Sequence, residues 1–335
     1  MNTQGTGEAI GERVVSSSAA MRYVMQEIAR AAERSVHVLL SGERGTGRET
    51  LARAIHARGR HNHGAFVAID CAKFSAHELE KHLFATDGNH GTTERRSVER
   101  VRRAAQLFQS KGGTLFLQNI VDLPARLQTR LLRVLRDGEV VIMDEGTRIE
   151  LDLRVITAGD ASFDVAVQDG RMLPDLFKRL CGMRVDVPAL RQRREDIPEL
   201  AVHLLNLLCA RENIPAKQLS DAAKSMLAAL PWRGNGEELR RLLEVLVMRA
   251  SAATISLDDV LANVRLDGQA TWFAVGGSLR EARARFETEY IAAVVAHHHG
   301  RIPEAAKSLG IQRSNLYRKM RRLNVRPKAQ TAFTS

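Results

Sequence analysis

Several features that would indicate a secreted, membrane-bound or metal-binding protein are missing from this sequence of 335 residues. Its three cysteines, Cys71, Cys181 and Cys209, show neither paired nor metal-ligand spacing. The N-terminus has no secretory signal pattern, and no apolar run reaches the roughly 18 residues of a membrane helix. There is also no internal repeat. We therefore expect reduced thiols, no metal site, no membrane partner and a cytoplasmic location.

Positive charge, by contrast, is in excess and is concentrated near the C-terminus. The net charge is +11. The segment 300–328 alone holds nine lysines or arginines and one glutamate, which gives 9 − 1 = +8. Such a distribution favours double-stranded DNA or another anionic partner over a merely basic surface.

The first half of the chain alternates between apolar strand patterns and amphipathic helix patterns. This alternation predicts an α/β fold with a doubly wound parallel sheet. From about residue 193 the pattern becomes helical, and a short linker precedes a last helical unit. We expect strands at 35–43, 65–72, 112–120 and 153–160, and helices that begin near Ser16–Ser18, at 49–59 and at 124–138.

The C-terminal unit has the pattern of a helix-turn-helix. Pro303 suits the first turn of one helix, Gly310 suits the turn, and Leu316 and Met320 form the inner face of a second helix. Because the start of such a helix enters the major groove, its outward side chains are candidates for DNA contacts. These candidates are Arg313, Ser314, Asn315, Tyr317, Arg318, Arg321, Arg322 and Arg326. A solvated basic helix is the alternative.

The helix before this unit has an apolar face formed by Leu279, Phe286, Tyr290, Ile291 and Val294. Two short helices alone could not cover so much apolar surface, so we expect a dimer through the C-terminal domain. The three histidines 297–299 that follow point in different directions on a helix, so a helix C-terminus explains them better than a metal cluster.

A glycine-rich loop follows the first predicted strand, in the stretch "LLSGERGTGRETLARAI". Its spacing approaches the phosphate-binding pattern G-x-x-x-x-G-K-[ST], with arginine in place of lysine. Backbone N–H groups of such a loop, together with the following helix N-terminus, can hold phosphates. The candidate nucleotide-binding residues are Gly42, Gly45, Thr46, Gly47, Arg48 and Glu49.

Further motifs extend this pattern along the chain: "GGTLFLQNI", "LQTRLLRVLRDGE", "PALRQRREDIPEL", "WRGNGEEL" and "GIQRSNLYRKM". Together they resemble the bacterial enhancer-binding proteins, which activate sigma-54 RNA polymerase and are typified by the nitrogen regulatory protein C. The resemblance implies an AAA+ doubly wound parallel-sheet core with a helical lid, followed by an all-α Fis-type helix-turn-helix domain. The implied segments are a disordered N-terminus at 1–15, the AAA+ α/β subdomain at 16–192, the lid at 193–265, a linker at 266–278 and the DNA-binding domain at 279–328.

Several positions depart from the family pattern. The lysine that reaches the phosphates is Arg48, and the Asp-Glu pair that supports Mg²⁺ and the attacking water is Gln118-Asn119. Asp70 stands where the family has the asparagine that pairs with that glutamate, and Asp160 stands at the sensor asparagine. Neutral amides cannot replace carboxylates as base or metal ligand.

Other departures concern the lid and the partner-binding loops. Glu237 replaces the lid arginine, while Arg179 keeps one of two arginine fingers and Leu173 replaces the other. The sigma-54 contact motif GAFTGA is absent after "HLFATDG", where Arg95, Arg96, Arg100, Arg102 and Arg103 gather instead. Two explanations fit these arginines: a solvated helix face, and a contact with DNA or a partner.

These departures leave three hypotheses. The first is a sequence-specific DNA-binding regulator that is not an enzyme, whose degenerate AAA+ domain serves oligomerisation or partner binding. It requires no cofactor, binds ATP or ADP at most without Mg-dependent turnover, and contacts RNA polymerase or an intact AAA+ relative. The alternative is an active ATP-dependent sigma-54 activator, and an architectural DNA protein like Fis is a third reading.

Overall fold

A five-stranded parallel sheet lies at the centre of the larger part of the molecule. The computed structural model describes residues 14–86, 98–160, 163–250, 252–264, 288, 291, 295, 301–309 and 311–322. The strands follow the order β2-β4-β7-β1-β8, and every neighbouring pair is parallel. Their bounds are β1 Val38–Ser41, β2 Phe66–Asp70, β4 Thr114–Gln118, β7 Arg154–Gly159 and β8 Met183–Asp186. The predicted doubly wound sheet is thus confirmed.

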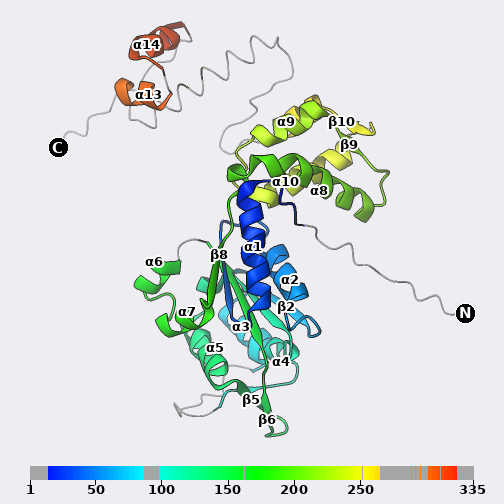
Figure 1. The fold of residues 1–335 in the computed structure, drawn as a ribbon, viewed down its shortest axis with the longest axis vertical. Coiled ribbons are helices and arrows are strands. Elements are labelled where there is room, and N and C mark those ends of the chain that lie inside the picture. Colours follow the sequence, from blue (N-terminus) through cyan, green and yellow to red (C-terminus); the bar gives the residue numbers. More distant parts are fainter. Residues whose placement is uncertain are drawn as a thin grey trace, which may run out of the picture. The chain divides into compact units, whose positions relative to one another are not determined.

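Helices cover both faces of this sheet, as a doubly wound fold requires. On one face α1 and α2 pack against apolar side chains such as Leu40, Phe116 and Ile156. The other face carries Leu39, Leu115 and Val155, which lie in a second apolar cluster with α3, α5 and α7. Figure 1 shows α1 and α2 beside each other along the sheet. These helices are α1 Ala19–Glu33, α2 Arg48–Arg58, α3 Ala76–Phe84, α5 Ala125–Asp137 and α7 Pro174–Leu180.

The predicted helix starts have a clear local cause. Ser18 caps α1, and its hydroxyl accepts from the backbone N–H of Met21 at 3.2 Å. Ser75 and Glu78 form a reciprocal capping box at the start of α3. Helix α5 ends at Gly138 in the left-handed conformation, which favours glycine.

Short elements surround the sheet. A small second sheet has the order β3-β5-β6, in which β5 and β6 are antiparallel. The sequence pattern did not predict these strands, because they are two to four residues long. Their bounds are β3 Arg100–Val101, β5 Glu139–Ile142 and β6 Arg148–Glu150, and the nearby short helices are α4 Gln106–Gln109 and α6 Phe163–Gln168.

A helical lid follows the sheet, as the sequence predicts from about residue 193. Helix α8 packs against α9 and α10, and the two short strands β9 and β10 pair in parallel. The lid consists of α8 Ile197–Arg211, β9 Gln218–Leu219, α9 Asp221–Ala229, α10 Asn235–Arg249, β10 Thr254–Ile255 and α11 Leu257–Asn263. Residues 1–260 form one compact unit and residues 261–335 form another.

The second unit contains α13 Ile302–Ser308 and α14 Arg313–Arg322. Pro303 lies in the first turn of α13, as predicted. A small apolar cluster joins the two helices, and its buried members are Ile291, Val295, Ile302, Ala305, Ala306, Leu316 and Met320. Ile291, one of the residues of the predicted dimer face, therefore packs into the apolar core of the C-terminal unit. The other residues of the predicted dimer face, and the histidines 297–299, lie outside the described residues.

Within the described part of the chain, no helix combines the length and the apolar character that crossing a membrane requires.

Candidate functional site

The glycine-rich loop leaves the carboxyl end of β1 and enters α2, as the sequence predicts. Gly47 is the N-cap of α2, with φ 92° and ψ 25°, and Gly45 has φ 78°. Both values favour glycine. Thr46 is buried, and its hydroxyl donates to the carbonyl oxygen of Glu43 at 2.8 Å. The loop thus presents a helix N-terminus in the geometry of an anion site.

Arg48 is the first residue of α2, and only 3% of its surface is exposed. Its Nη1 donates to the carbonyl oxygen of Gly42 at 2.7 Å, whereas its buried Nη2 has no hydrogen-bond partner within the described part of the chain. Burial lowers the pKa of this guanidinium, and the charges of Asp160 and Asp70 act in the opposite direction. A buried donor without a partner costs about 1–3 kcal/mol. An anion at the loop would satisfy it.

The lid packs directly on this loop. A Cβ atom added at Gly45 would lie 2.3 Å from the carbonyl oxygen of Gly234. Glu237, in the first turn of α10, also lies beside Gly45, and its carboxylate pairs with Arg241 at 2.6 Å. The structure therefore brings Glu237 to the loop, as the sequence predicts, although its charge is engaged by its own helix.

The carboxyl ends of β2, β4 and β7 form the edge beside the loop. Asp70 pairs in register with Gln118, and Asn119 follows in the left-handed conformation with φ 54°. The Nδ2 of Asn119 donates to Oδ1 of Asp70 at 2.6 Å. Asp160 comes directly after β7 and influences the charge of Arg48. Two carboxylates thus flank the amides that end β4.

Two predicted residues lie elsewhere. Glu49 forms a surface ion pair with Arg53 at 2.7 Å. Arg179 is exposed on α7 and influences His37, which precedes β1 at the opposite edge of the sheet. In this chain Arg179 therefore lies toward the end of the sheet opposite to the loop.

Sequence reasoning missed the residues that join the lid to the loop. Arg191 donates to both carboxylate oxygens of Glu43, at 2.7 and 2.5 Å. Hydrogen bonds from Arg191 and Asn235 lower the pKa of Glu43 to about 2. Arg193 is buried, and its Nη2 donates to the carbonyl oxygen of Thr46 at 2.7 Å. The only signal for these contacts was the arginine-rich motif "PALRQRREDIPEL", which names no partner.

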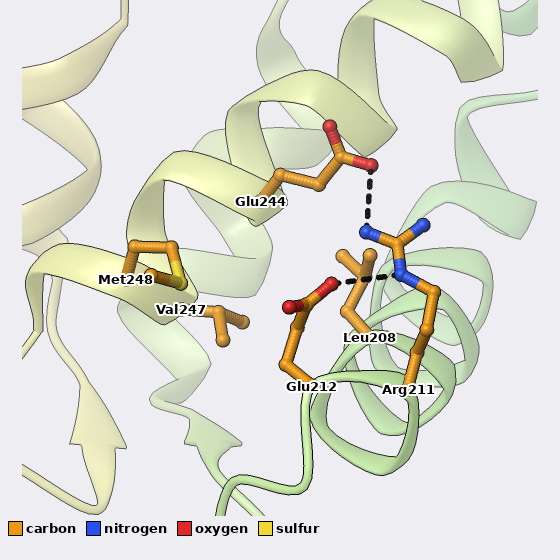
Figure 2. Close-up of a pocket in the computed structure, with 6 residues that line it drawn as sticks. All are labelled: Leu208, Arg211, Glu212, Glu244, Val247 and Met248. Carbon is orange, nitrogen blue, oxygen red and sulfur yellow. Dashed lines mark hydrogen bonds and ion pairs between the residues drawn. The ribbon is translucent and has the colours of Figure 1, made fainter.

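A separate cavity of about 210 Å³ lies in the lid between α8 and α10. Figure 2 shows Arg211 bridging Glu212 and Glu244 across it, at 2.8 and 3.4 Å, with Leu208, Val247 and Met248 around them. None of the loop residues lines this cavity. It is small, and its lining contains neither a glycine-rich loop nor a helix N-terminus that could hold phosphates.

The outer face of α14 carries the predicted DNA-contact residues. Arg313, Ser314, Tyr317, Arg318 and Arg321 are exposed, while Leu316 and Met320 are buried beneath them. Arg318 donates to Oδ1 of Asn315 at 2.9 Å, and the Arg313 guanidinium lies 5.8 Å from the ring centre of Tyr317. Arg322 ends the helix, and Arg326 lies outside the described residues.

Other predictions fall partly outside the described residues. The segment 87–97, where the GAFTGA motif was expected and found missing from the sequence, is among them, together with Arg95 and Arg96. Of the nearby arginines, Arg103 pairs with Glu145 at 2.6 Å. This ion pair lies at the surface, where the Arg103 side chain is 59% exposed, so it fits a solvated face and leaves the contact with DNA or a partner untested.

Comparisons with known proteins agree with the geometry. Residues 14–186 match the sigma-54 interaction domain, 191–271 the AAA+ ATPase lid domain, and 282–323 the bacterial regulatory proteins of the Fis family. The DNA-binding transcriptional regulator NtrC of Klebsiella pneumoniae is 32% identical over 93% of this chain and 70% of its own length. The transcriptional regulatory protein GlrR of Escherichia coli K12 is 33% identical, over 95% and 69%.

Solved structures are similar as well. NtrX from Brucella abortus, determined in complex with ADP and with ATP, has a TM-score of 0.64 at 31% identity, over 93% of this chain and 69% of that chain. RuvB of Thermotoga maritima, at 17% identity and a TM-score of 0.51 over 88% and 84%, shares the fold alone.

One expectation from sequence is wrong: that the chain is not an enzyme. The match to an AAA+ ATPase lid and the similarity to proteins solved with ATP and ADP contradict it. That expectation rested on several replaced family residues together, among them Arg48, Gln118, Asn119 and Glu237. In the structure Asp70 and Asp160 flank the two amides that end β4.

With its sigma-54 interaction domain, AAA+ lid and Fis-type helix-turn-helix in sequence, the chain belongs to the NtrC family of sigma-54-dependent transcriptional regulators.

Proposed function

We propose that this chain is an ATP-dependent transcriptional regulator that binds ATP or ADP at the loop 42–48 and DNA through α14. The observation that carries the nucleotide site is Arg48, a buried cation in a phosphate-loop geometry whose Nη2 has no partner. Phosphate oxygens supply the acceptor that this nitrogen lacks. The nucleotide-bound NtrX structures support the same assignment.

The residues around the loop also fit the Mg²⁺ ion that accompanies ATP. Among the described residues, no group of three or more His, Cys, Asp or Glu could hold a metal alone. Mg²⁺ in phosphate sites, however, needs only one or two carboxylates because phosphates and waters complete its shell. Asp70 and Asp160 would supply them, and the bound ion would neutralise charge on the phosphates. Asn119 holds the Asp70 carboxylate in a fixed orientation.

The assembly that we propose follows from the two units. The AAA+ unit forms a higher oligomer in which the exposed Arg179 faces a neighbour's loop. The C-terminal unit forms a dimer on DNA, which would read half-sites roughly 34 Å apart. RNA polymerase or a related AAA+ protein is the further partner.

Titration of the purified protein with a fluorescent ATP analogue, alongside phosphate release, tests this function. We expect saturable binding and phosphate release above a protein-free control, both dependent on Mg²⁺. Absence of binding would contradict the nucleotide site. Binding without phosphate release at saturating ATP would contradict the ATP-dependent part.

The DNA-binding face predicts different effects for two of its arginines. Arg313, at the start of α14, is placed for base edges, and Arg313→Ala should cost roughly 1–3 kcal/mol of discrimination between operator and unrelated DNA. Arg321, two turns later, is placed for phosphates, and Arg321→Ala should weaken both DNAs alike and flatten the salt slope by about 1. Binding titrations at several salt concentrations measure both. An equal loss of discrimination in the two variants would refute the assignment of base contacts to Arg313 and phosphate contacts to Arg321.

A further inference from the structure

Three consecutive carbonyl groups of the loop each accept a hydrogen bond from the lid or from the segment that leads into it. Asn235 Nδ2 donates to the carbonyl oxygen of Arg44 at 2.8 Å. The backbone N–H of Gly236 donates to the carbonyl oxygen of Gly45 at 2.9 Å. Arg193 Nη2 donates to the carbonyl oxygen of Thr46 at 2.7 Å. We call this set the three lid donors.

The geometry of the peptide group gives these contacts a consequence for the opposite side of the loop. A trans peptide is planar, so its C=O and N–H groups point in opposite directions. The carbonyls of residues 44, 45 and 46 share their peptide groups with the N–H groups of Gly45, Thr46 and Gly47. Holding the three carbonyls therefore also orients the three N–H groups that a phosphate-binding loop presents to its anion.

Further hydrogen bonds support the residues that provide the lid donors. Asn235 is fully buried, and its Oδ1 accepts from the N–H of Leu190 at 2.8 Å. Arg193 shares a 3-10 turn with the fully buried Asp196, whose N–H donates to the Arg193 carbonyl at 3.0 Å. The carboxylate of Asp196 accepts from the N–H and the hydroxyl of Ser18, at 2.5 and 2.8 Å. The side chain of Asn235 is thus held in place directly, and the backbone of Arg193 is held through its turn.

Close packing leaves the loop little freedom to reorient without them. Gly45 lies against Gly234. A Cβ atom added at Gly236 would lie 3.0 Å from the carbonyl oxygen of Gly45. The hydrogen bond from Arg193 to the Thr46 carbonyl also buries a positive charge, because Arg193 is only 7% exposed. Burying a guanidinium is costly, and here Nε of Arg193 finds no hydrogen-bond partner in the described part of the chain. A role in holding the loop accounts for its presence.

We propose that Asn235 and Arg193 are positioning residues for the nucleotide site: by holding the Arg44 and Thr46 carbonyls, they orient the loop N–H groups toward the phosphates. The lid position thereby sets the affinity of the loop for ATP and ADP. This proposal rests on the nucleotide-binding function proposed above. Neither residue needs to touch the nucleotide.

The first test replaces Asn235 by alanine and measures ATP and ADP affinity of the full chain with fluorescent analogues. We expect a loss of at least about 10-fold, because the substitution removes a donor without changing any charge. Asn213→Ala is the matched control. Asn213 has φ 52° and Asn235 has φ 55°, so both variants carry the same backbone strain, but Asn213 lies in the exposed turn after α8. Its nucleotide affinity should stay within about 2-fold of the unaltered protein.

The second test uses Arg193, where charge and donor can be separated. Arg193→Met should weaken binding by at least about 10-fold, and Arg193→Lys, which keeps the charge and a donor, should recover most of that loss. Arg191→Met removes an equal charge from a residue that binds the Glu43 carboxylate and no loop carbonyl, so it should have a smaller effect. Urea unfolding without nucleotide reports the stability of each variant.

The outcomes separate the two proposals. If the unaltered protein shows no saturable nucleotide binding, the proposed function is wrong and this inference falls with it. If it binds but Asn235→Ala matches Asn213→Ala, or Arg193→Lys is as weak as Arg193→Met, only the positioning role is overturned. Loss in Asn235→Ala and Arg193→Met with recovery in Arg193→Lys supports it.

Discussion

Replacing Arg48 with alanine is expected to weaken ATP binding by roughly 10- to 150-fold. Arg48 is a buried cation at the first turn of α2, and its Nη2 has no hydrogen-bond partner among the residues that the structure describes. A hydrogen bond to a charged group contributes about 1.5–3 kcal/mol, which corresponds to that range. The measurement is a titration with a fluorescent ATP analogue, checked by nucleotide-dependent thermal stabilisation.

Arg53→Ala is the control for this prediction. It removes the same charge from the same helix, but Arg53 is exposed and engaged with Glu49 and the ring of Phe66. We expect its ATP affinity to stay within about 2-fold of the unaltered protein. An Arg48→Ala protein that binds ATP as tightly as Arg53→Ala would remove Arg48 from the site. The nucleotide would then be held by the loop N–H groups alone.

Much of the fold could be predicted from local patterns. The four predicted strands at 35–43, 65–72, 112–120 and 153–160 contain β1, β2, β4 and β7, because each lies in a mostly apolar run. Strands β1, β4 and β7 are buried along nearly their whole length, whereas the edge strand β2 has only Ile69 buried. Strand β8 was not predicted. Its sequence MRVD has only one buried residue, and its pairing with β1 joins positions about 145 residues apart. Tertiary contact, and not local propensity, makes it a strand.

Some parts of the candidate site could likewise be predicted from local sequence and others could not. The loop and the α14 face could be found because glycine spacing, helix periodicity and charge are local properties of the sequence. The contacts of the loop with Arg191, Arg193 and Asn235 could not, since these residues lie 147 to 192 positions away from their partners. No single-sequence pattern pairs a given arginine with a given carbonyl.

The mistaken expectation about enzymatic activity has a related cause. A motif comparison scores each position alone, so Gln118 and Asn119 counted as two losses. In the structure Asn119 is hydrogen-bonded to Asp70, one strand away, and Asp160 lies on the other side of β4. The family resemblance assigned Asp70 and Asp160 to the same site, but only the structure shows the hydrogen bond between Asn119 and Asp70.

A buried ion network predicts the largest effect on stability. The Arg130 guanidinium on α5 lies 2.7 Å from Glu80 and 2.7 Å from Glu99, and these three side chains are 12%, 6% and 3% exposed. Arg130 Nη1 also donates to the Thr86 hydroxyl at 3.0 Å, and the guanidinium lies 3.8 Å from the centre of the Phe84 ring. The network thereby connects Thr86 and Glu99, which lie on either side of the segment 87–97.

Arg130→Ala should lower the free energy of unfolding by about 3–5 kcal/mol, because it leaves two buried carboxylates without their main partner. Arg126 and Arg133 approach Glu80 and Glu99 only at 3.2 and 3.8 Å, so they compensate weakly. Urea unfolding measures the loss.

Arg136→Ala is the matched control on the same helix, where the side chain is 55% exposed and pairs with the adjacent Asp137, and it should cost less than about 1 kcal/mol. Combining Arg130→Met with Glu80→Gln and Glu99→Gln removes the uncompensated charges and should restore most of the stability. An Arg130→Ala loss no larger than that of Arg136→Ala would mean that water reaches these carboxylates. A triple variant as unstable as Arg130→Ala would mean instead that the stability comes from packing against Phe84 and not from charge.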